Sequence, residues 1–226
     1  MTEFDLILTG SEGFLGQNVK EHLLKQNLKL ACLDLKLGHD FRDEDFVKNW
    51  FKNNSAPVIV NAFGLNDKIS NLSLESNFDF ELKQMKEFFE INVMALYSIC
   101  REYIRNRKTG RIINFSSIYS KVSPRRDIYL NYAKNPAYGM SKAAVNQLGR
   151  HLSVYFAPEF TVNTLILGGF LENQDDGFVR RYEKNVPLNR MGSPKDLFSI
   201  IDFLAFAKSD YLTGSEITID GGWTAL

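Results

Sequence analysis

The sequence predicts an α/β fold: a single-domain, Rossmann-type doubly wound parallel sheet with helices on both faces. Short runs rich in Val, Ile, Leu and Phe recur without polar alternation, which is typical of strands covered on both faces. Segments with helical apolar spacing separate these runs and are long enough to be crossovers. Because a βαβα order gives parallel strands, and 226 residues suit one core, we expect one domain over residues 1–226.

The expected elements follow this alternation along the chain. The expected strands run from Phe4 to Leu8, Leu28 to Leu33, Val58 to Val60, Arg111 to Phe115, Thr161 to Leu167 and Glu216 to Ile219. Helical patterns between them include Gly16 to Lys25, Glu81 to Arg105 and Tyr138 to Phe156. Two stretches are irregular, Asn66 to Asp79 and Ser120 to Pro136. Loops of this length inside a compact domain often bind ligands.

The composition excludes several classes of partner. The 27 basic residues balance 27 acidic ones, so no overall field draws the chain to nucleic acid or a membrane, and a small-molecule partner is expected. No apolar run approaches the roughly 20 residues that span a bilayer, and residues 1–9 lack a signal-peptide pattern. We therefore expect a cytoplasmic protein. Cys32 and Cys100 are isolated, so neither a disulfide framework nor a metal site is expected.

A glycine-rich turn links the first expected strand to the first helix with the spacing GxxGxxG. Glycines allow a tight turn and close approach to a pyrophosphate, which the unpaired N–H groups of a helix N-terminus attract. The spacing alone also fits a plain strand-to-helix turn, but the strand before it and the helix after it favour a dinucleotide site. The cofactor contacts expected in this turn are Gly10, Ser11, Gly13, Phe14, Leu15 and Gly16.

Asp34 ends the second expected strand, where a carboxylate can accept hydrogen bonds from the adenosine ribose. That carboxylate repels a 2′-phosphate, and Glu12 in the glycine turn adds a second negative charge, so NAD is expected in preference to NADP. Lys36 argues the other way, because its flexible ammonium could reach a phosphate. Asp34 could also be a solvated residue at the end of a strand.

Tyr138 and Lys142 are candidates for proton transfer. They stand four residues apart, which on a helix places both side chains on one face. A phenol with an ordinary pKa is a poor base at neutral pH, and a nearby ammonium lowers that pKa by stabilising the phenolate. The same spacing also occurs in solvent-facing pairs, but Tyr119, Tyr129 and Tyr132 have no lysine four residues on.

Together these motifs resemble the short-chain dehydrogenase/reductase family over nearly the whole chain. His39 to Asp43 is similar to the family's loop in which the residue matching Asp40 contacts the adenine amino group, with Phe41 beside it. The segment Asn61, Ala62, Phe63 and Gly64 resembles the turn that packs the adenosine half. Tyr211 to Glu216 and Ile219 to Trp223 match the family's last strand and tail. The resemblance implies an NAD(P)-dependent oxidoreductase that interconverts a hydroxyl and a carbonyl.

The resemblance also implies roles for individual residues. Ser117, rather than Ser116, matches the serine that donates a hydrogen bond to the substrate oxygen. Asn92 matches the asparagine that completes a proton relay past the lysine, although it could instead bridge backbone groups at a helix kink. Lys142, Tyr138, Gly168, Phe170 and Leu171 are implied at the nicotinamide. A homodimer or homotetramer through the long helices 81–105 and 138–156 is implied as well.

Two departures from the family pattern carry expectations of their own. The interval from Ser117 to Tyr138 is longer than usual, so Ser120 to Pro136 is expected to bulge out of the fold. Gly168 and Gly169 stand where the family has Pro-Gly, which costs rigidity at the nicotinamide but removes no catalytic group.

The substrate is the least determined part of the prediction. The inserted stretch and the later lid carry arginines and aromatics that could grip a carboxylate, a phosphate or a nucleotide-linked sugar, or could be solvated surface. The pattern is similar to bacterial oxidoreductases of flagellin and surface-glycan modification, which act on nucleotide-linked amino sugars or nonulosonic-acid precursors. The alternatives are a 3-oxoacyl thioester reductase and a non-catalytic dinucleotide-binding regulatory or scaffold protein. The expected substrate contacts are Ser117, Tyr119, Arg125, Arg126 and Gly169.

Overall fold

A computed structural model describes residues 1–66, 81–130, 134–207 and 210–226. Of the expected irregular stretch from Asn66 to Asp79, everything after Asn66 lies outside the described residues, as does Tyr132. Across the described ranges, no helix is both long enough and apolar enough to cross a membrane.

The predicted parallel sheet is confirmed. Six parallel strands lie side by side in the order β3-β2-β5-β6-β7-β8. Their bounds differ from the expected ones by at most two residues at either end: β2 Leu6–Thr9, β3 Leu30–Leu33, β5 Val58–Asn61, β6 Gly110–Ser117, β7 Phe160–Leu167 and β8 Glu216–Ile219. A separate pair joins β1 (Thr2–Glu3) to β4 (Asn54–Ser55).

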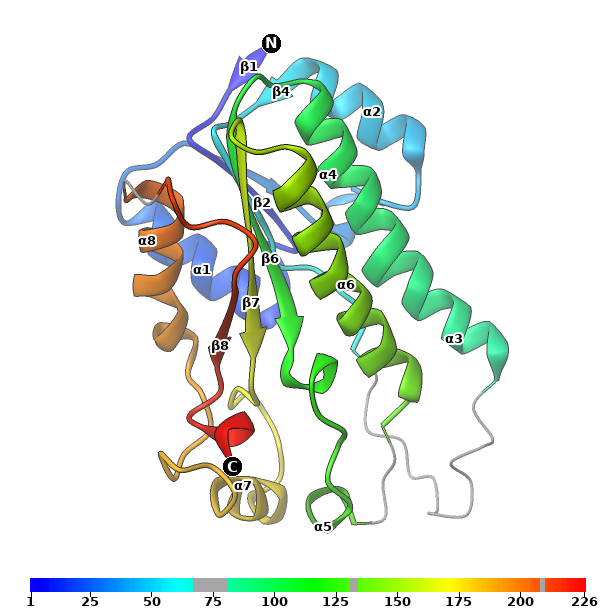
Figure 1. Cartoon of the computed structure of the whole chain (residues 1–226), viewed down its shortest axis with the longest axis vertical. Helices are drawn as coiled ribbons and strands as arrows, with labels where there is room; N and C mark the ends of the chain where they lie inside the picture. Colours follow the sequence, from blue (N-terminus) through cyan, green and yellow to red (C-terminus); the bar gives the residue numbers. More distant parts are fainter. Residues whose placement is uncertain (67–80, 131–133, 208–209) are drawn as a thin grey trace.

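Helices cover both faces of the sheet, and alternate strand residues enter two apolar clusters. Ile7 of β2 packs into the cluster beneath α2 (Glu44–Asn53), α4 (Leu96–Arg105) and α6 (Pro136–Tyr155). Its neighbours Leu6 and Leu8 pack into the opposite cluster beneath α1 (Phe14–Leu24) and α8 (Phe198–Phe206). Figure 1 shows α1 and α8 to the left of the sheet and α4 and α6 to the right. Burial on both faces explains why the strand sequences do not alternate.

The helix expected from Glu81 to Arg105 is interrupted. It consists of α3 (Leu82–Phe89), a π-helical segment (Glu90–Ala95) and α4, which follow one another directly. Apolar spacing cannot distinguish one extra residue per turn from a regular helix over so short a stretch. Asn92, one of the predicted catalytic residues, lies inside the π-helical segment, and such segments are frequent at functional sites.

The carboxyl ends of the strands are covered by three segments that are distant in sequence. These are α5 (Arg126–Tyr129), α7 (Asp176–Glu183) and the C-terminal residues, which gather at the bottom of Figure 1. They share an apolar group, here called the carboxyl-edge cluster, of Ile118, Ile128, Tyr129, Ile166, Phe178, Tyr182, Val186, Met191 and Trp223.

The expectation that Ser120 to Pro136 bulges out of the fold is wrong for its described central part. Ile128 and Tyr129 are buried, and the Ile128 carbonyl accepts a hydrogen bond from Nε of Arg181 at 2.9 Å. The Tyr129 ring contacts that of Phe178 in α7, with centroids 5.5 Å apart, so this part of the insertion packs against the fold.

Candidate active site

A cavity of about 800 Å³ opens at the carboxyl edge of the sheet. The strand order reverses between β2 and β5, and in doubly wound sheets such a switch point is where ligands bind. The cavity starts beside Gly13 and continues past the end of β5 to the ends of β6 and β7. Of the predicted site residues, it is lined by Gly13, Phe14, Leu15, Ala62, Phe63, Gly64, Ser117, Tyr119, Tyr138, Lys142, Gly168, Gly169 and Phe170.

Close packing explains two of the three glycines in the turn. Gly10 has φ +75°, and a Cβ on it would lie 2.5 Å from the backbone nitrogen of Phe63. A Cβ on Gly16 would lie 1.9 Å from the Gly10 carbonyl oxygen. A Cβ on Gly13 would meet that same oxygen at 3.4 Å, an ordinary contact, and Gly13 faces the cavity. Gly10 and Gly16 therefore shape the turn, while Gly13 keeps the cavity open next to it.

The first turn of α1 fits a diphosphate. Gly13 is the N-cap residue, no side chain caps this helix end, and Phe14 and Leu15 of the first turn line the cavity. Uncapped N–H groups at a helix N-terminus form a site for anions. This end of the cavity therefore suits the diphosphate of a nicotinamide dinucleotide.

Asp34 is not a solvated strand-end residue, because its carboxylate is buried and engaged. Oδ2 accepts the backbone N–H of Glu12 at 3.0 Å, and Oδ1 accepts that of Lys36 at 2.9 Å. Asp34 therefore ties the end of β3 to the glycine turn. It does not line the cavity.

Two lysines accompany the two carboxylates beside the glycine turn. Lys36 donates from Nζ to the Glu12 carbonyl at 2.8 Å, and Lys20 pairs with the Glu12 carboxylate. The hydrogen bond from Lys20 holds the pKa of Glu12 below its usual range. The repulsion of a 2′-phosphate is therefore weaker than the carboxylates alone would produce.

Asp40 and Phe41 lie outside the cavity lining. Arg42 pairs with both carboxylate oxygens of Asp40, and its Nη2 lies 2.6 Å from Oδ2. The ring of Phe41 is buried, with its centroid 5.0 Å from that of Phe63. Asp40 is therefore already paired with Arg42, and Phe41 contacts Phe63, which lines the cavity.

Asn61 is also turned away from the cavity lining. Its Oδ1 accepts from Thr9 Oγ1 at 3.0 Å, and its Nδ2 donates to Asn114 Oδ1 at 2.9 Å. These residues share one register row of the sheet and are buried. The sequence predicts that Asn61 contacts the cofactor, but it does not reveal these hydrogen bonds between neighbouring strands. Through them Asn61 helps to fix the pairing of β2, β5 and β6.

Tyr138 and Lys142 both reach the cavity from the first turns of α6. Lys142 Nζ lies 6.0 Å from the centroid of the Tyr138 ring and donates to the Phe115 carbonyl at 3.1 Å. Burial lowers the pKa of Lys142 to about 8. A second ammonium, that of Lys134, lies 5.2 Å from the same ring centroid. The phenol thus has two cations beside it.

Neighbouring aromatic side chains hold the Tyr138 ring. Tyr119 and Phe88 make edge contacts with it, at centroid distances of 6.4 and 6.3 Å. A Cβ on Gly139 would lie 2.7 Å from the Tyr119 carbonyl oxygen, so glycine lets α6 approach the end of β6. These contacts fix where the phenol enters the cavity.

The two serines that end β6 use their hydroxyls differently. Ser116 donates to the Lys142 carbonyl at 3.1 Å. Ser117 accepts the backbone N–H of Tyr119 at 3.2 Å, a contact that does not use its own hydroxyl hydrogen. The geometry therefore favours Ser117 over Ser116 as the donor to a substrate oxygen.

Asn92 connects the end of β5 to α6. Its Oδ1 accepts the Leu65 N–H at 2.6 Å, and its Nδ2 donates to the Leu65 carbonyl at 3.0 Å and to Ser141 Oγ at 2.9 Å. A Cβ on Gly64 would lie 3.0 Å from Lys142 Nζ and 3.1 Å from Asn92 Oδ1. Asn92 bridges backbone groups at a helix irregularity and also lies near Lys142, so the proton relay remains a prediction.

The predicted arginine contacts are not brought to the cavity. Arg125 pairs with Asp127 at 2.8 Å, both side chains are exposed, and neither Arg125 nor Arg126 belongs to the lining. Leu171 is half exposed and also lies outside it.

The part of the cavity lined by Tyr119, Tyr129, Phe178 and Tyr182, here called the substrate end, is aromatic. Oη of Tyr119 lies 2.6 Å from Oη of Tyr129, and Phe178 and Tyr182 of α7 complete the wall. Sequence reasoning missed Phe178. Its four-residue spacing from Tyr182 was the available signal, since it places both rings on one helix face.

Comparisons with known proteins identify similar sequences. A family model described as enoyl-(acyl carrier protein) reductase matches residues 17–224. Post-translational flagellin modification protein A of Campylobacter coli is 32% identical over 152 residues, which are 65% of this chain and 59% of that protein. The chain thus matches less than two thirds of that relative's length. The 3-oxoacyl-[acyl-carrier-protein] reductase of Chlamydia pneumoniae is 25% identical over 97% of this chain and 87% of its own.

Solved structures share the fold. A short-chain dehydrogenase from Leptospira borgpetersenii with bound NAD+ has a TM-score of 0.87 and 26% identity, covering 99% of this chain and 94% of that one. A gluconate 5-dehydrogenase from Burkholderia cenocepacia, in complex with NADP and tartrate, has a TM-score of 0.81 at 19% identity, covering 100% and 96%.

Proposed function

The chain belongs to the short-chain dehydrogenase/reductase family of NAD(P)-dependent oxidoreductases, and on this premise we propose that Tyr138, Lys142 and Ser117 interconvert a hydroxyl and a carbonyl on a small molecule. One observation carries the proposal. A single cavity joins the uncapped start of α1 to these three side chains.

The residues divide the proton chemistry among them. In the oxidative direction Tyr138, as phenolate, takes the proton of the substrate hydroxyl; in the reductive direction its phenol returns a proton to the forming alkoxide. The ammonium of Lys142 stabilises the phenolate. Ser117 donates a hydrogen bond to the substrate oxygen, whose charge changes during the reaction. The nicotinamide, when bound, accepts or supplies the hydride.

The chain's own residues would hold the dinucleotide along the cavity. The N–H groups at the start of α1 bind the diphosphate, and Lys142 holds the nicotinamide ribose. Gly168 and Phe170, which line the cavity, would contact the nicotinamide. Asp34 is assigned to the adenosine ribose. Its carboxylate already accepts two backbone N–H groups, so only its remaining lone pairs can accept hydrogen bonds from the ribose hydroxyls.

We propose a preference for NAD over NADP. The carboxylates of Asp34 and Glu12 support it, as does the NAD+ bound in the Leptospira relative. Dissociation constants of both dinucleotides provide the test, with Asp34→Asn removing the negative charge. Equal affinities in the unmutated chain would contradict the preference.

For the substrate we propose a nucleotide-linked sugar or nonulosonic-acid precursor. The flagellin-modification relative supports this class, and so do the tyrosine hydroxyls at the substrate end. Reduction of a 3-oxoacyl thioester is the second candidate, favoured by the acyl-carrier-protein reductase that matches nearly the whole chain. A panel of nucleotide sugars and oxoacyl thioesters, monitored by NADH absorbance, separates the two. Dinucleotide binding without turnover of any panel member would favour a regulatory or scaffold role.

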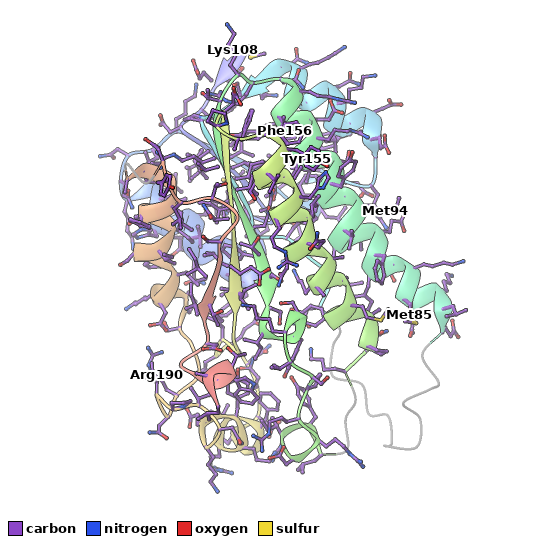
Figure 2. All side chains as sticks on the ribbon, in the orientation of Figure 1. Met85, Met94, Lys108, Tyr155, Phe156 and Arg190 are labelled. Atoms are coloured by element: carbon purple, nitrogen blue, oxygen red, sulfur yellow. The ribbon has the colours of Figure 1, made fainter. Side chains whose placement is uncertain are left out.

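We further propose a cytoplasmic homodimer or homotetramer that associates through residues 82–105 and α6. Both cysteines are free thiols, which suits a reducing compartment. Met94 and Tyr155 are 66% and 71% exposed, and Figure 2 labels them together with Phe156 on these helices. Light scattering of the wild-type chain and of Tyr155→Glu tests this assembly: the variant should be the smaller particle, and a monomeric wild type would contradict it.

A further inference from the structure

The backbone that follows β7 is a pair of glycines, Gly168 and Gly169, at the nicotinamide end of the cavity. Glycine restrains the backbone less than any other residue, and the family's proline is absent here. The structure contains a different restraint. The Gly169 N–H donates to Oη of Tyr182 at 2.6 Å, and a Cβ on Gly169 would lie 2.6 Å from Cζ of that ring. Tyr182 therefore lies directly against the glycine backbone.

Tyr182 is itself held in place. Only 2% of its surface is exposed, and its ring stacks on Trp223 with centroids 4.5 Å apart and planes at 19°. Trp223 lies in a turn that Asp220 closes by accepting the N–H groups of Gly222 and Thr224, each at 2.8 Å. The side chain that accepts the hydrogen bond from the Gly169 N–H thus has little freedom to move.

The C-terminal turn at Asp220 also packs closely against Gly168. A Cβ on Gly168 would lie 2.8 Å from Cα of Asp220. Both glycines are therefore packed against groups from later in the chain, Gly168 against the C-terminal turn and Gly169 against α7.

The chemistry of the phenol suits a permanent acceptor. Burial raises the pKa of Tyr182 to about 12, so it stays neutral at physiological pH. A neutral hydroxyl can accept the Gly169 N–H and still donate its own hydrogen.

We propose that Tyr182, held by Trp223, is a positioning residue that fixes the Gly168–Gly169 backbone for the nicotinamide end of the site. The inference rests on the proposed function, because it assigns the dinucleotide to this cavity. It makes the C-terminal turn part of the cofactor site, although Trp223 does not line the cavity.

The first test needs no cofactor. Tyr182→Phe removes the hydroxyl and keeps the stacked ring. We expect amide hydrogen exchange of residues 168–170 to accelerate about ten-fold, while the exchange rates of the strands stay unchanged. Tyr211→Phe, the same substitution at an exposed tyrosine, should leave all exchange rates unchanged. Wild-type exchange at residues 168–170 in Tyr182→Phe would overturn the inference, because a purely packing role does not need the hydroxyl.

The second test measures whether the restraint on Gly168 and Gly169 affects the affinity for the dinucleotide. NADH fluorescence titration should show about five-fold weaker binding by Tyr182→Phe, the effect of losing one hydrogen bond. Trp223→Ala should weaken binding in the same direction, and Trp223→Phe, which keeps a ring for stacking, should restore it. Unaltered NADH affinity in Tyr182→Phe and Trp223→Ala would refute a positioning role. Failure of the wild-type chain to bind any dinucleotide would instead overturn the proposed function itself.

Discussion

The two ends of the cavity are built in different ways. At the dinucleotide end, glycines of one short turn pack on the backbone of the neighbouring strand end, and the binding groups are backbone N–H groups. At the substrate end, side chains from β7, the turn after β6, the inserted stretch, α7 and the C-terminal turn meet in the carboxyl-edge cluster. The first construction depends on residues close in sequence, and the second on contacts between distant segments. Substitutions should therefore alter binding at one end with little effect on the other, except at Tyr182 and Trp223, which connect the carboxyl-edge cluster to the Gly168–Gly169 backbone.

Tyr138→Phe is the substitution with the largest expected effect on turnover. It removes the group that exchanges a proton with the substrate, so kcat should fall by at least about 100-fold. The affinity for NADH should stay within a few-fold, because the phenol acts on the substrate. Steady-state rates and NADH titrations measure both, with Tyr211→Phe as the control. Unchanged turnover would remove Tyr138 from the mechanism.

Gly16→Ala and Gly13→Ala separate shape from binding at the dinucleotide end. The methyl group of Gly16→Ala would lie 1.9 Å from the Gly10 carbonyl oxygen, so the free energy of unfolding should fall by about 3 kcal/mol. Gly13→Ala has room for its methyl and a backbone φ of −79°, which any residue adopts. It should unfold like the wild type but bind NADH more weakly. Urea unfolding together with NADH titration distinguishes them, and equal loss of stability in both variants would contradict the division.

Lys142 lies where the two ends meet, and its burial should make stability depend on pH. Its pKa is about 8 in the folded chain against an ordinary value of 10.5, so between these pH values the unfolded chain binds more protons. The free energy of unfolding from this site therefore rises as pH increases from 8 to 10.5. Lys142→Met should be more stable than the wild type at pH 7, by up to about 3 kcal/mol, and the difference should shrink towards pH 10.5.

Urea unfolding at several pH values measures the Lys142 effect. The exposed Lys83→Met is the matched control, whose difference from the wild type should not vary with pH. A stability difference for Lys142→Met that is constant with pH would show that this ammonium is not buried in the folded chain.

What could be predicted from the sequence follows the same division. The glycine turn and the pairing of Tyr138 with Lys142 depend on spacing within one turn or one helix, so a linear pattern contains them. The contact of Gly169 with Tyr182 joins a loop to a helix, and no periodicity relates them.

The partners of polar and charged side chains could not be predicted from the sequence for a related reason. Arg125 and Arg126 are predicted ligand contacts because they are basic residues in a loop. In the folded chain, Arg125 pairs with the nearby Asp127. The turn at Asn61 is predicted to pack the adenosine half of a cofactor, and the sequence does not reveal that neighbouring strands hold its side-chain amide. A sequence shows which polar groups exist, and only the folded chain shows which of them already have partners.

Tyr129→Phe is the smallest of these effects and the sharpest test of separation between the ends. It removes one of two hydroxyls whose oxygens lie 2.6 Å apart, and burial raises the pKa of the other, Tyr119, well above its usual range. Because the Tyr119 phenol stays neutral, its hydroxyl can share a hydrogen bond with Tyr129 and contribute to a polar contact with a substrate. KM for the substrate should rise about three- to five-fold, as for one lost hydrogen bond, with NADH affinity unchanged. Tyr119→Phe should have a similar effect, and the double variant should add little, since both single changes break the same hydrogen bond. Additive effects would mean that the two hydroxyls act separately, and a matching loss of NADH affinity would mean that the two ends of the cavity are coupled.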